Sequence, residues 1–68
     1  MKGIRYFYRD FYGCTYSIRP NAGSYDLVAR VPQGDIFYVK NYSTFRGARI
    51  ALGKISDGTA RPTGTQEV

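Results

Sequence analysis

The chain of 68 residues contains no histidine and only one cysteine, Cys14. Histidine is the commonest general base and metal ligand, so its absence argues against acid–base catalysis and against most metal sites. A single cysteine cannot form an internal disulfide, and it cannot supply the roughly four ligands of a structural zinc site. We therefore expect a non-enzymatic protein without cofactor or metal, in which Cys14 is a small buried side chain.

Acidic residues are also few. The chain has five of them against ten lysines and arginines, which gives a formal net charge of +5 and a pI near 9.7. The acids are scattered, and none follows the Asp-x-Asp spacing of calcium or magnesium sites. The excess of positive charge favours anionic partners, with nucleic acid first and an acidic protein surface second.

Long apolar segments are absent as well. No stretch approaches the roughly 18 apolar residues of a membrane-spanning helix, and the N-terminal residues lack the apolar core of a signal peptide. Disulfides are rare in the reducing cytosol, which agrees with the lone thiol. We therefore expect a cytoplasmic protein without a membrane partner.

Tyrosine is abundant, with seven residues beside four phenylalanines, and aromatic side chains favour strands. Alternation with a period of two predicts strands at about 4–9, 14–19, 25–31 and 36–42. The first two segments also fit one bent strand. In the last strand, Phe37 and Val39 suit a core face. Tyr38, Lys40 and Tyr42 suit the opposite face.

The apolar spacing changes from strand-like to helix-like after the last predicted strand. One helical face is formed by Phe45, Ala48, Leu52 and Ile55, with Ala51 beside them. The opposite face carries Arg46, Arg49 and Lys54. Ser43 and Thr44 are both suitable N-caps. Residues 58–68 are rich in Gly, Thr and Pro, so we expect a flexible tail there and a folded domain over 1–57.

These elements predict an α+β domain: a three- to four-stranded antiparallel sheet with one C-terminal helix packed on one face. The other sheet face is left uncovered, and tyrosines alternate with cations along the strands. Such a surface can stack bases and hold phosphates, or present tyrosine and arginine to a protein partner. The candidate binding residues are Arg5, Tyr6, Tyr8, Arg9, Arg19, Arg30, Tyr38, Lys40, Tyr42, Arg46 and Arg49.

The segment from Tyr16 to Ile55 runs strand, turn, strand, hairpin, strand, helix, with Tyr42-Ser43-Thr44-Phe45-x-x-Ala48 at the last junction. This layout resembles the arm-type DNA-binding domains that precede the catalytic domain of tyrosine integrases, and it is similar to small accessory proteins of phages and prophages. In that family the helix commonly opens Thr-x-x-Glu-Ala, and Gly47 replaces the acid here. The resemblance implies a free-standing module that binds DNA through its sheet, without recombination chemistry.

Two hypotheses about function remain open at this point. The first is a nucleic-acid-binding accessory protein of a phage or mobile element. The second is a protein-interaction module, such as a phage-encoded inhibitor of a host enzyme or defence complex. Because a chain this short buries only about 60% of its unfolded surface and lacks a disulfide or metal, a homodimer is a further expectation.

Overall fold

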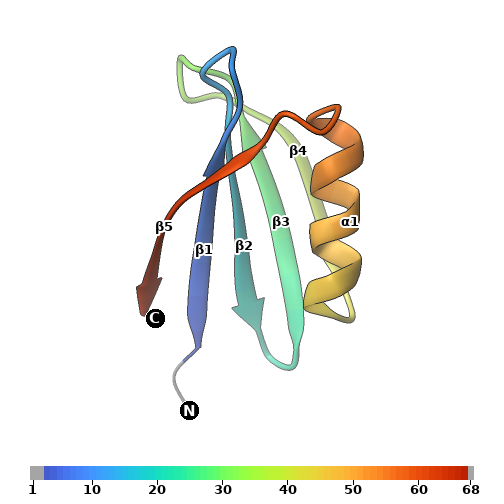
Figure 1. Ribbon diagram of the computed structural model, residues 1–68. Coiled ribbons are helices and arrows are strands. Elements are labelled where there is room, and N and C mark those ends of the chain that lie inside the picture. The colour runs from blue at the N-terminus through green and yellow to red at the C-terminus, as the bar shows by residue number, and fades with distance from the viewer. Residues whose placement is uncertain (1–2, 68) are drawn as a thin grey trace.

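In the computed structural model of the protein, the structure of residues 3–67 is described (Figure 1). Its elements are β1 Ile4–Arg9, β2 Thr15–Asn21, β3 Ser24–Arg30, β4 Ile36–Tyr42, α1 Phe45–Ile55 and β5 Arg61–Glu67. The strands form one antiparallel sheet in the order β4-β3-β2-β1-β5. Four strands form a meander, and the chain then returns through α1 to pair β5 with β1. The α+β class and the antiparallel sheet are thereby confirmed.

The C-terminal segment differs from the prediction. Arg61–Glu67 forms β5, so the sheet has five strands, the helix is not the last element, and the expected flexible tail over 58–68 was wrong for 61–67. Val68 lies outside the described residues. Every side chain of β5 is exposed, so the strand is held by its backbone pairing with β1. A prediction based on apolar content cannot detect a strand of this kind.

The N-terminal region forms two strands rather than one bent strand, because the chain reverses between Arg9 and Thr15. The next reversal is the tight turn at Ala22 and Gly23, whose φ angles of 52° and 87° match the primed turns that join hairpin strands. β2 therefore extends through Asn21, two residues beyond the predicted end.

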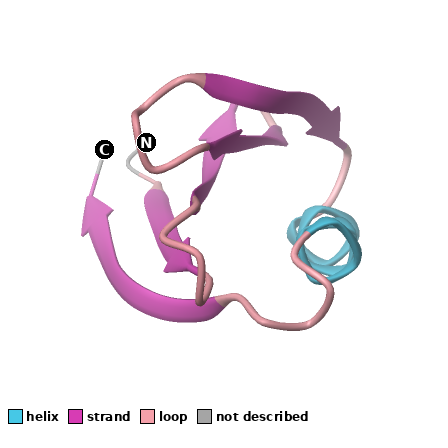
Figure 2. Cartoon of the chain, turned by 90° about the horizontal axis from the view of Figure 1, so that it is seen from above, coloured by secondary structure: helices cyan, strands magenta, loops and turns pink. Residues whose placement is uncertain are grey.

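The helix begins after Thr44, whose hydroxyl oxygen accepts a 3.0 Å hydrogen bond from the Gly47 amide. Thr44 rather than Ser43 is thus the N-cap, a role that stabilises a helix by about 1 kcal/mol. The helix packs on β2, β3 and β4, and the predicted apolar face buries Ala48 and Leu52. Figure 2 shows the helix on one side of the curved sheet and no element covering the other.

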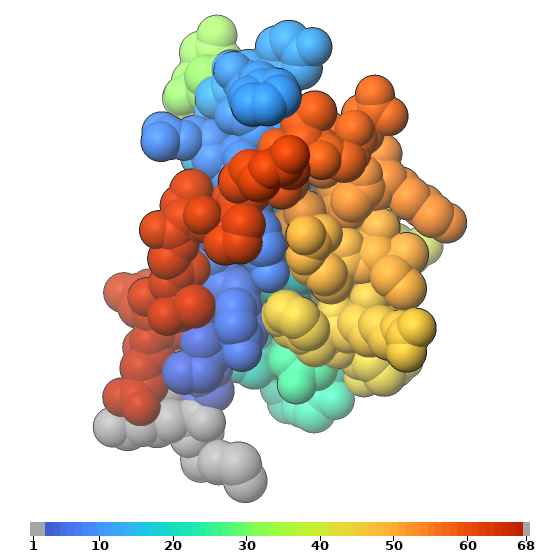
Figure 3. All heavy atoms as spheres, viewed as in Figure 1, coloured from blue at the N-terminus to red at the C-terminus, as the bar shows by residue number. Residues whose placement is uncertain are grey.

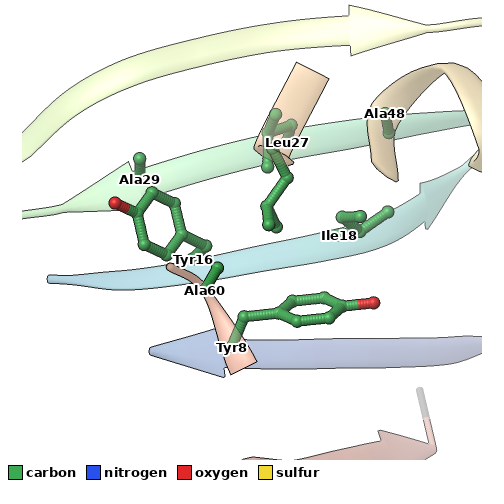
Figure 4. Packing of buried hydrophobic residues seen from close by; sticks show 8 residues of the cluster. Tyr8, Tyr16, Ile18, Leu27, Ala29, Ala48 and Ala60 are labelled. Carbon is green, nitrogen blue, oxygen red and sulfur yellow. The ribbon is translucent and has the colours of Figure 1, made fainter. Parts of the chain in front are cut away.

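The core lies between the helix and the sheet (Figure 4). Its buried members are Tyr8, Tyr16, Ile18, Leu27, Ala29, Ala48, Leu52 and Ala60. Ala60 joins this core just before β5, and in Figure 3 the first part of β5 is seen crossing the same face of the molecule beside the helix. Full burial of a leucine or isoleucine contributes about 1.5–3 kcal/mol, so these few side chains carry much of the stability.

Within residues 3–67, no helix has the length and apolar character needed to cross a bilayer.

Candidate nucleic-acid interface

The helix divides the sheet into a covered and an uncovered face, and this division corrects the predicted orientation of β4. Val39 pairs with Val28 on the uncovered face and is 61% exposed. Tyr38 pairs with the buried Ala29 and lies on the covered face. Alternation gives the two sets of side chains but not which set meets the helix, since each set contains aromatic or apolar residues beside a polar one.

Phe37 is a special case at the bulge where the β3–β4 register shifts. Its ring is half exposed and makes an edge contact with the ring of Tyr16, at 6.4 Å between centroids. Phe37 was predicted to lie in the core. Among the described residues, its one ring contact with the core is this contact with Tyr16, at the end of the covered face.

The tyrosines expected on the uncovered face lie on the covered one. Tyr8 is buried, and the ring of Tyr6 packs 4.7 Å from that of Phe45 in the helix. The hydroxyls of Tyr38 and Tyr42 are 2.7 Å apart. This hydrogen bond, helped by burial, raises the pKa of Tyr42 to about 12. The expected placement of these four tyrosines for base stacking on an open sheet was therefore wrong.

Three of the candidate cations are also directed elsewhere. Lys40 Nζ lies 5.6 Å from the ring centre of Tyr42, on the covered side. The guanidinium of Arg49 lies 5.1 Å over the ring of Tyr8, so this residue points toward β1 and not away from the sheet as predicted. Arg46 is exposed on the helix, away from the uncovered sheet face.

Strand register gathers the remaining arginines on the uncovered face. Arg9 and Arg30 both stand opposite Thr15, and Arg19 stands opposite Asp26. Arg5 is level with Arg19, because the next residue of β1 pairs with Ile18. Arg9, Thr15 and Arg30 thus form one polar row across the sheet, and Arg5, Arg19 and Asp26 form another. Between these two rows lies a third, made of Phe7, Ser17, Val28 and Val39. We call the surface formed by Arg5, Arg9, Arg19 and Arg30 the arginine face.

Two adjoining hollows, of about 230 and 280 Å³, form a groove along this face. The first is lined by Arg5, Ser17, Arg19, Asp26, Val28, Arg30 and Val39. The second shares Ser17, Val28 and Arg30 with it and extends to Phe7. Arginines from three neighbouring strands thus line one groove with an apolar floor.

The electrostatics of the groove are strongly positive. Its one acid, Asp26, accepts hydrogen bonds of 3.0 Å from the Asn21 amide and 2.7 Å from the Asn41 amide. Arg5 Nε is shielded from solvent and has no hydrogen-bond partner among the described residues, while its guanidinium lies 5.9 Å from the ring centre of Phe7.

A second feature, which the sequence prediction missed, is the β1–β2 loop of residues 10–14, which we call the aromatic loop. Phe11 and Tyr12 at its tip are 79% and 80% exposed. The loop is closed by hydrogen bonds from the Asp10 amide to the Cys14 carbonyl and from the Gly13 amide to the Asp10 carbonyl. Two adjacent aromatic rings are therefore presented to solvent from an ordered turn.

Asp10 fixes the aromatic loop through its carboxylate. Oδ1 accepts hydrogen bonds from the Tyr12 and Cys14 amides, at 2.8 and 3.0 Å, and Oδ2 accepts one of 2.7 Å from the Tyr16 hydroxyl. Partial burial pushes the pKa of Asp10 upward, but these hydrogen bonds outweigh it and hold the pKa below its ordinary value. Burial and the same carboxylate raise the pKa of Tyr16.

The sequence does contain a signal for this loop. Asp10-Phe11-Tyr12-Gly13 begins with a residue that hydrogen-bonds the amide two positions on and ends with the residue best suited to positive φ. Gly13 has φ of 87°, and a Cβ there would come within 3.3 Å of the Pro32 ring. Asp10 and Gly13 therefore indicate a turn. The rings of Phe11 and Tyr12, which lie between them, are expected to face solvent.

Cys14 is half-buried at the end of the aromatic loop. Burial, followed by the negative charge of Asp10, raises the pKa of its thiol. The thiol is therefore protonated at neutral pH and a weak nucleophile. No three acidic or cysteine side chains of residues 3–67 come together as metal ligands would.

Comparison with known proteins gives no relative. No family model matches the chain, no curated protein matches it, and no solved structure matches its fold. The resemblance to integrase arm-type domains stays a prediction.

Proposed function

We propose that this chain is a non-catalytic module that binds nucleic acid through the arginine face, as an accessory protein of phage or mobile-element type. The observation that carries the proposal is the convergence of Arg5, Arg19 and Arg30, from three strands, on one groove. The phage or mobile-element assignment is supported by the sequence resemblance alone.

The chemistry of the groove suits a phosphate backbone. A guanidinium presents several N–H donors in a fixed plane, and it can bind two oxygens of one phosphate. Three arginines outnumber Asp26, the one acid among the described residues that line the first hollow, so the net charge there stays positive. The apolar floor between the polar rows can contact sugars or bases.

The experiment is a fluorescence anisotropy titration of labelled random-sequence oligonucleotides, single-stranded and duplex, at about 50 and 200 mM salt. We expect micromolar or tighter dissociation constants at the lower salt, and a loss of about tenfold or more at the higher salt, because several phosphate contacts release counterions. No binding at 50 mM salt, where electrostatic attraction is strongest, would contradict the proposal.

A second function, protein interaction, is favoured by the edge of the sheet beside the groove. β4 is an outer strand of the sheet, and its side chains Ile36 and Val39 are at least half exposed, as is Ile50 of the adjacent helix. An exposed apolar edge strand can pair with a strand of another protein, or with a second copy of this chain to form a homodimer. A phage-encoded inhibitor of a host enzyme or defence complex would use such an edge.

The second function is tested with the wild type and Val39→Lys, which places a charge on this edge. Capture from nuclease-treated host lysate should retain one stoichiometric protein on the wild type and lose it on the variant. Light scattering at micromolar concentration separates self-association, which gives a dimer mass for the wild type alone. A monomer that retains no protein would contradict this second function.

A further inference from the structure

The aromatic loop is built to hold two rings in water. Phe11 and Tyr12 are the most exposed large apolar side chains of the described residues, yet the backbone that carries them is tied down at both ends. The Asp10 carboxylate binds the Tyr12 amide directly and is itself held by the hydroxyl of the buried Tyr16. A ring on a fixed backbone loses little conformational freedom on binding, which favours affinity.

The base of this loop adjoins the arginine face. Arg9 immediately precedes the loop and stands opposite Arg61 of β5, and Arg30 stands on the other side of Thr15. The Arg61 guanidinium donates to the carbonyls of Gly58 and Ala60, which fixes it at this end of the sheet. Arg30 is fixed in the same way by the carbonyl of Gly34. Arg9 and two arginines held by hydrogen bonds, Arg30 and Arg61, therefore lie at the end of the sheet where the aromatic loop begins.

Rings beside cations match the two parts of a single nucleic-acid strand. Bases stack on aromatic side chains while neighbouring arginines hold the phosphates, and each stacked base contributes about five- to 150-fold in affinity. In a duplex the base faces are occupied by their neighbours, so a ring on a surface loop cannot reach them without unstacking. Paired nucleic acid would then meet the arginine face alone.

We infer that the aromatic loop is a stacking site for unpaired bases, formed by Phe11 and Tyr12, which gives the protein a preference for single-stranded or locally open nucleic acid. This inference rests on the proposed nucleic-acid function. It adds to that function the class of substrate and the two side chains that select it.

The test uses three labelled probes with the same number of phosphates per strand: a 15-residue oligothymidine, an abasic strand of the same length, and a duplex. The abasic strand keeps the charge and removes the bases. We expect the wild type to bind oligothymidine at least about tenfold more tightly than the abasic strand. Equal binding of these two strands would overturn the inference.

Variants then assign the effect to the two rings. Phe11→Ala and Tyr12→Ala should each weaken oligothymidine binding by about fivefold or more while leaving the duplex and abasic affinities unchanged. Tyr12→Phe retains a ring and should bind as the wild type does. Ile50→Ala, a truncation of another exposed side chain on the helix, should have no effect. Unchanged melting temperatures in all four variants show that folding is intact.

The outcomes separate this inference from the function on which it rests. If the wild type binds none of the probes, the proposed nucleic-acid function fails and the stacking site fails with it. If the wild type binds all probes and the two alanine variants bind them equally well, only the stacking site is overturned.

Discussion

The hydroxyl of Tyr16, a core residue of β2, donates a 2.7 Å hydrogen bond to Oδ2 of Asp10 in the β1–β2 loop. This contact connects the hydrophobic core to the loop that carries Phe11 and Tyr12. The other carboxylate oxygen accepts two loop amides, so this one side chain both supports the closed loop and attaches it to the sheet.

Removal of the carboxylate should destabilise the protein as well as the loop. In Asp10→Ala the partly buried Tyr16 hydroxyl and the Cys14 amide lose their acceptor, so we expect the free energy of unfolding to fall by about 1–3 kcal/mol. Urea denaturation followed by tyrosine fluorescence measures this change. Amide exchange at Tyr12 and Cys14 should accelerate in the same variant.

Tyr16→Phe is the matched control, because it removes the hydroxyl and leaves the ring and both loop amides in place. A single hydrogen bond is lost, which costs about 1 kcal/mol, so this variant should be less destabilised than Asp10→Ala. An equal or larger loss in Tyr16→Phe would show that the loop amides gain nothing from Asp10.

The same carboxylate predicts a pH dependence at the acidic end. The pKa of Asp10 is lower in the folded protein than its unfolded value of about 3.9. The stability that it contributes is therefore present above about pH 4, and it is lost as the pH falls through the folded pKa. Unfolding free energies measured from pH 6 to pH 2 should fall more steeply for the wild type than for Asp10→Asn. Identical slopes in the two proteins would contradict this assignment.

Much of the fold was visible in the sequence because side-chain periodicity carries it. The strand at 4–9, the helix with Leu52 on its buried face and the hairpin before the strand at 36–42 all follow from alternation, capping and turn residues. β5 was missed because a strand of exposed polar residues is held by backbone pairing with a distant partner, which no local pattern records. Its existence depends on the tertiary arrangement.

The sequence predicted the arginines of the candidate site but not the position of its tyrosines, because the tyrosine positions also depend on tertiary packing. Arg5, Arg19 and Arg30 lie together on the uncovered face because strand register places them there. Tyr38 and Tyr42 lie under the helix because the sequence gives two possible core faces for β4, and only the packed helix selects one. Phe11 and Tyr12 fell between the predicted strands at 4–9 and 14–19 and were not among the candidate binding residues, although the turn residues around them indicate an exposed loop.

The arginine face can be tested one charge at a time. Arg19 is exposed and lines the groove without a side-chain hydrogen bond to the described residues, so Arg19→Ala removes little besides its charge. We expect weaker binding of every oligonucleotide and a salt slope reduced by about one unit. Arg30→Ala is less suitable, because Arg30 also holds the Gly34 carbonyl.

Arg46→Ala is the control for this experiment, since Arg46 is also exposed but lies on the helix, away from the groove. Both substitutions remove one positive charge, so a general electrostatic effect would weaken oligonucleotide binding equally in the two variants. Binding lost in Arg19→Ala and retained in Arg46→Ala assigns the interface to the sheet. The reverse result would assign it to the helix.

The helix–sheet core should be sensitive to a single truncation. Leu52 is completely buried between α1 and the sheet, so Leu52→Ala should lower the free energy of unfolding by about 2–5 kcal/mol. Ile50→Ala lies two residues away on the exposed side of the same helix and should change it by less than about 0.5 kcal/mol. Chemical denaturation of both variants compares these values, and equal losses would indicate that the helix faces are assigned wrongly.

The last strand is best tested by amide hydrogen exchange, because its pairing with β1 involves backbone and little side-chain burial. If Arg61–Glu67 pairs as described, alternate amides of this segment should exchange at least about fivefold more slowly than in an unfolded chain. Deletion of residues 61–68 should then expose the outer edge of β1, and amides of β1 that point toward β5 should lose protection. Amides between β2 and β3 should keep theirs, because that ladder does not touch β5. Exchange of the whole segment at the rate of an unfolded chain would instead restore the flexible tail that its composition suggests, and would leave β1 as an edge strand of a four-stranded sheet.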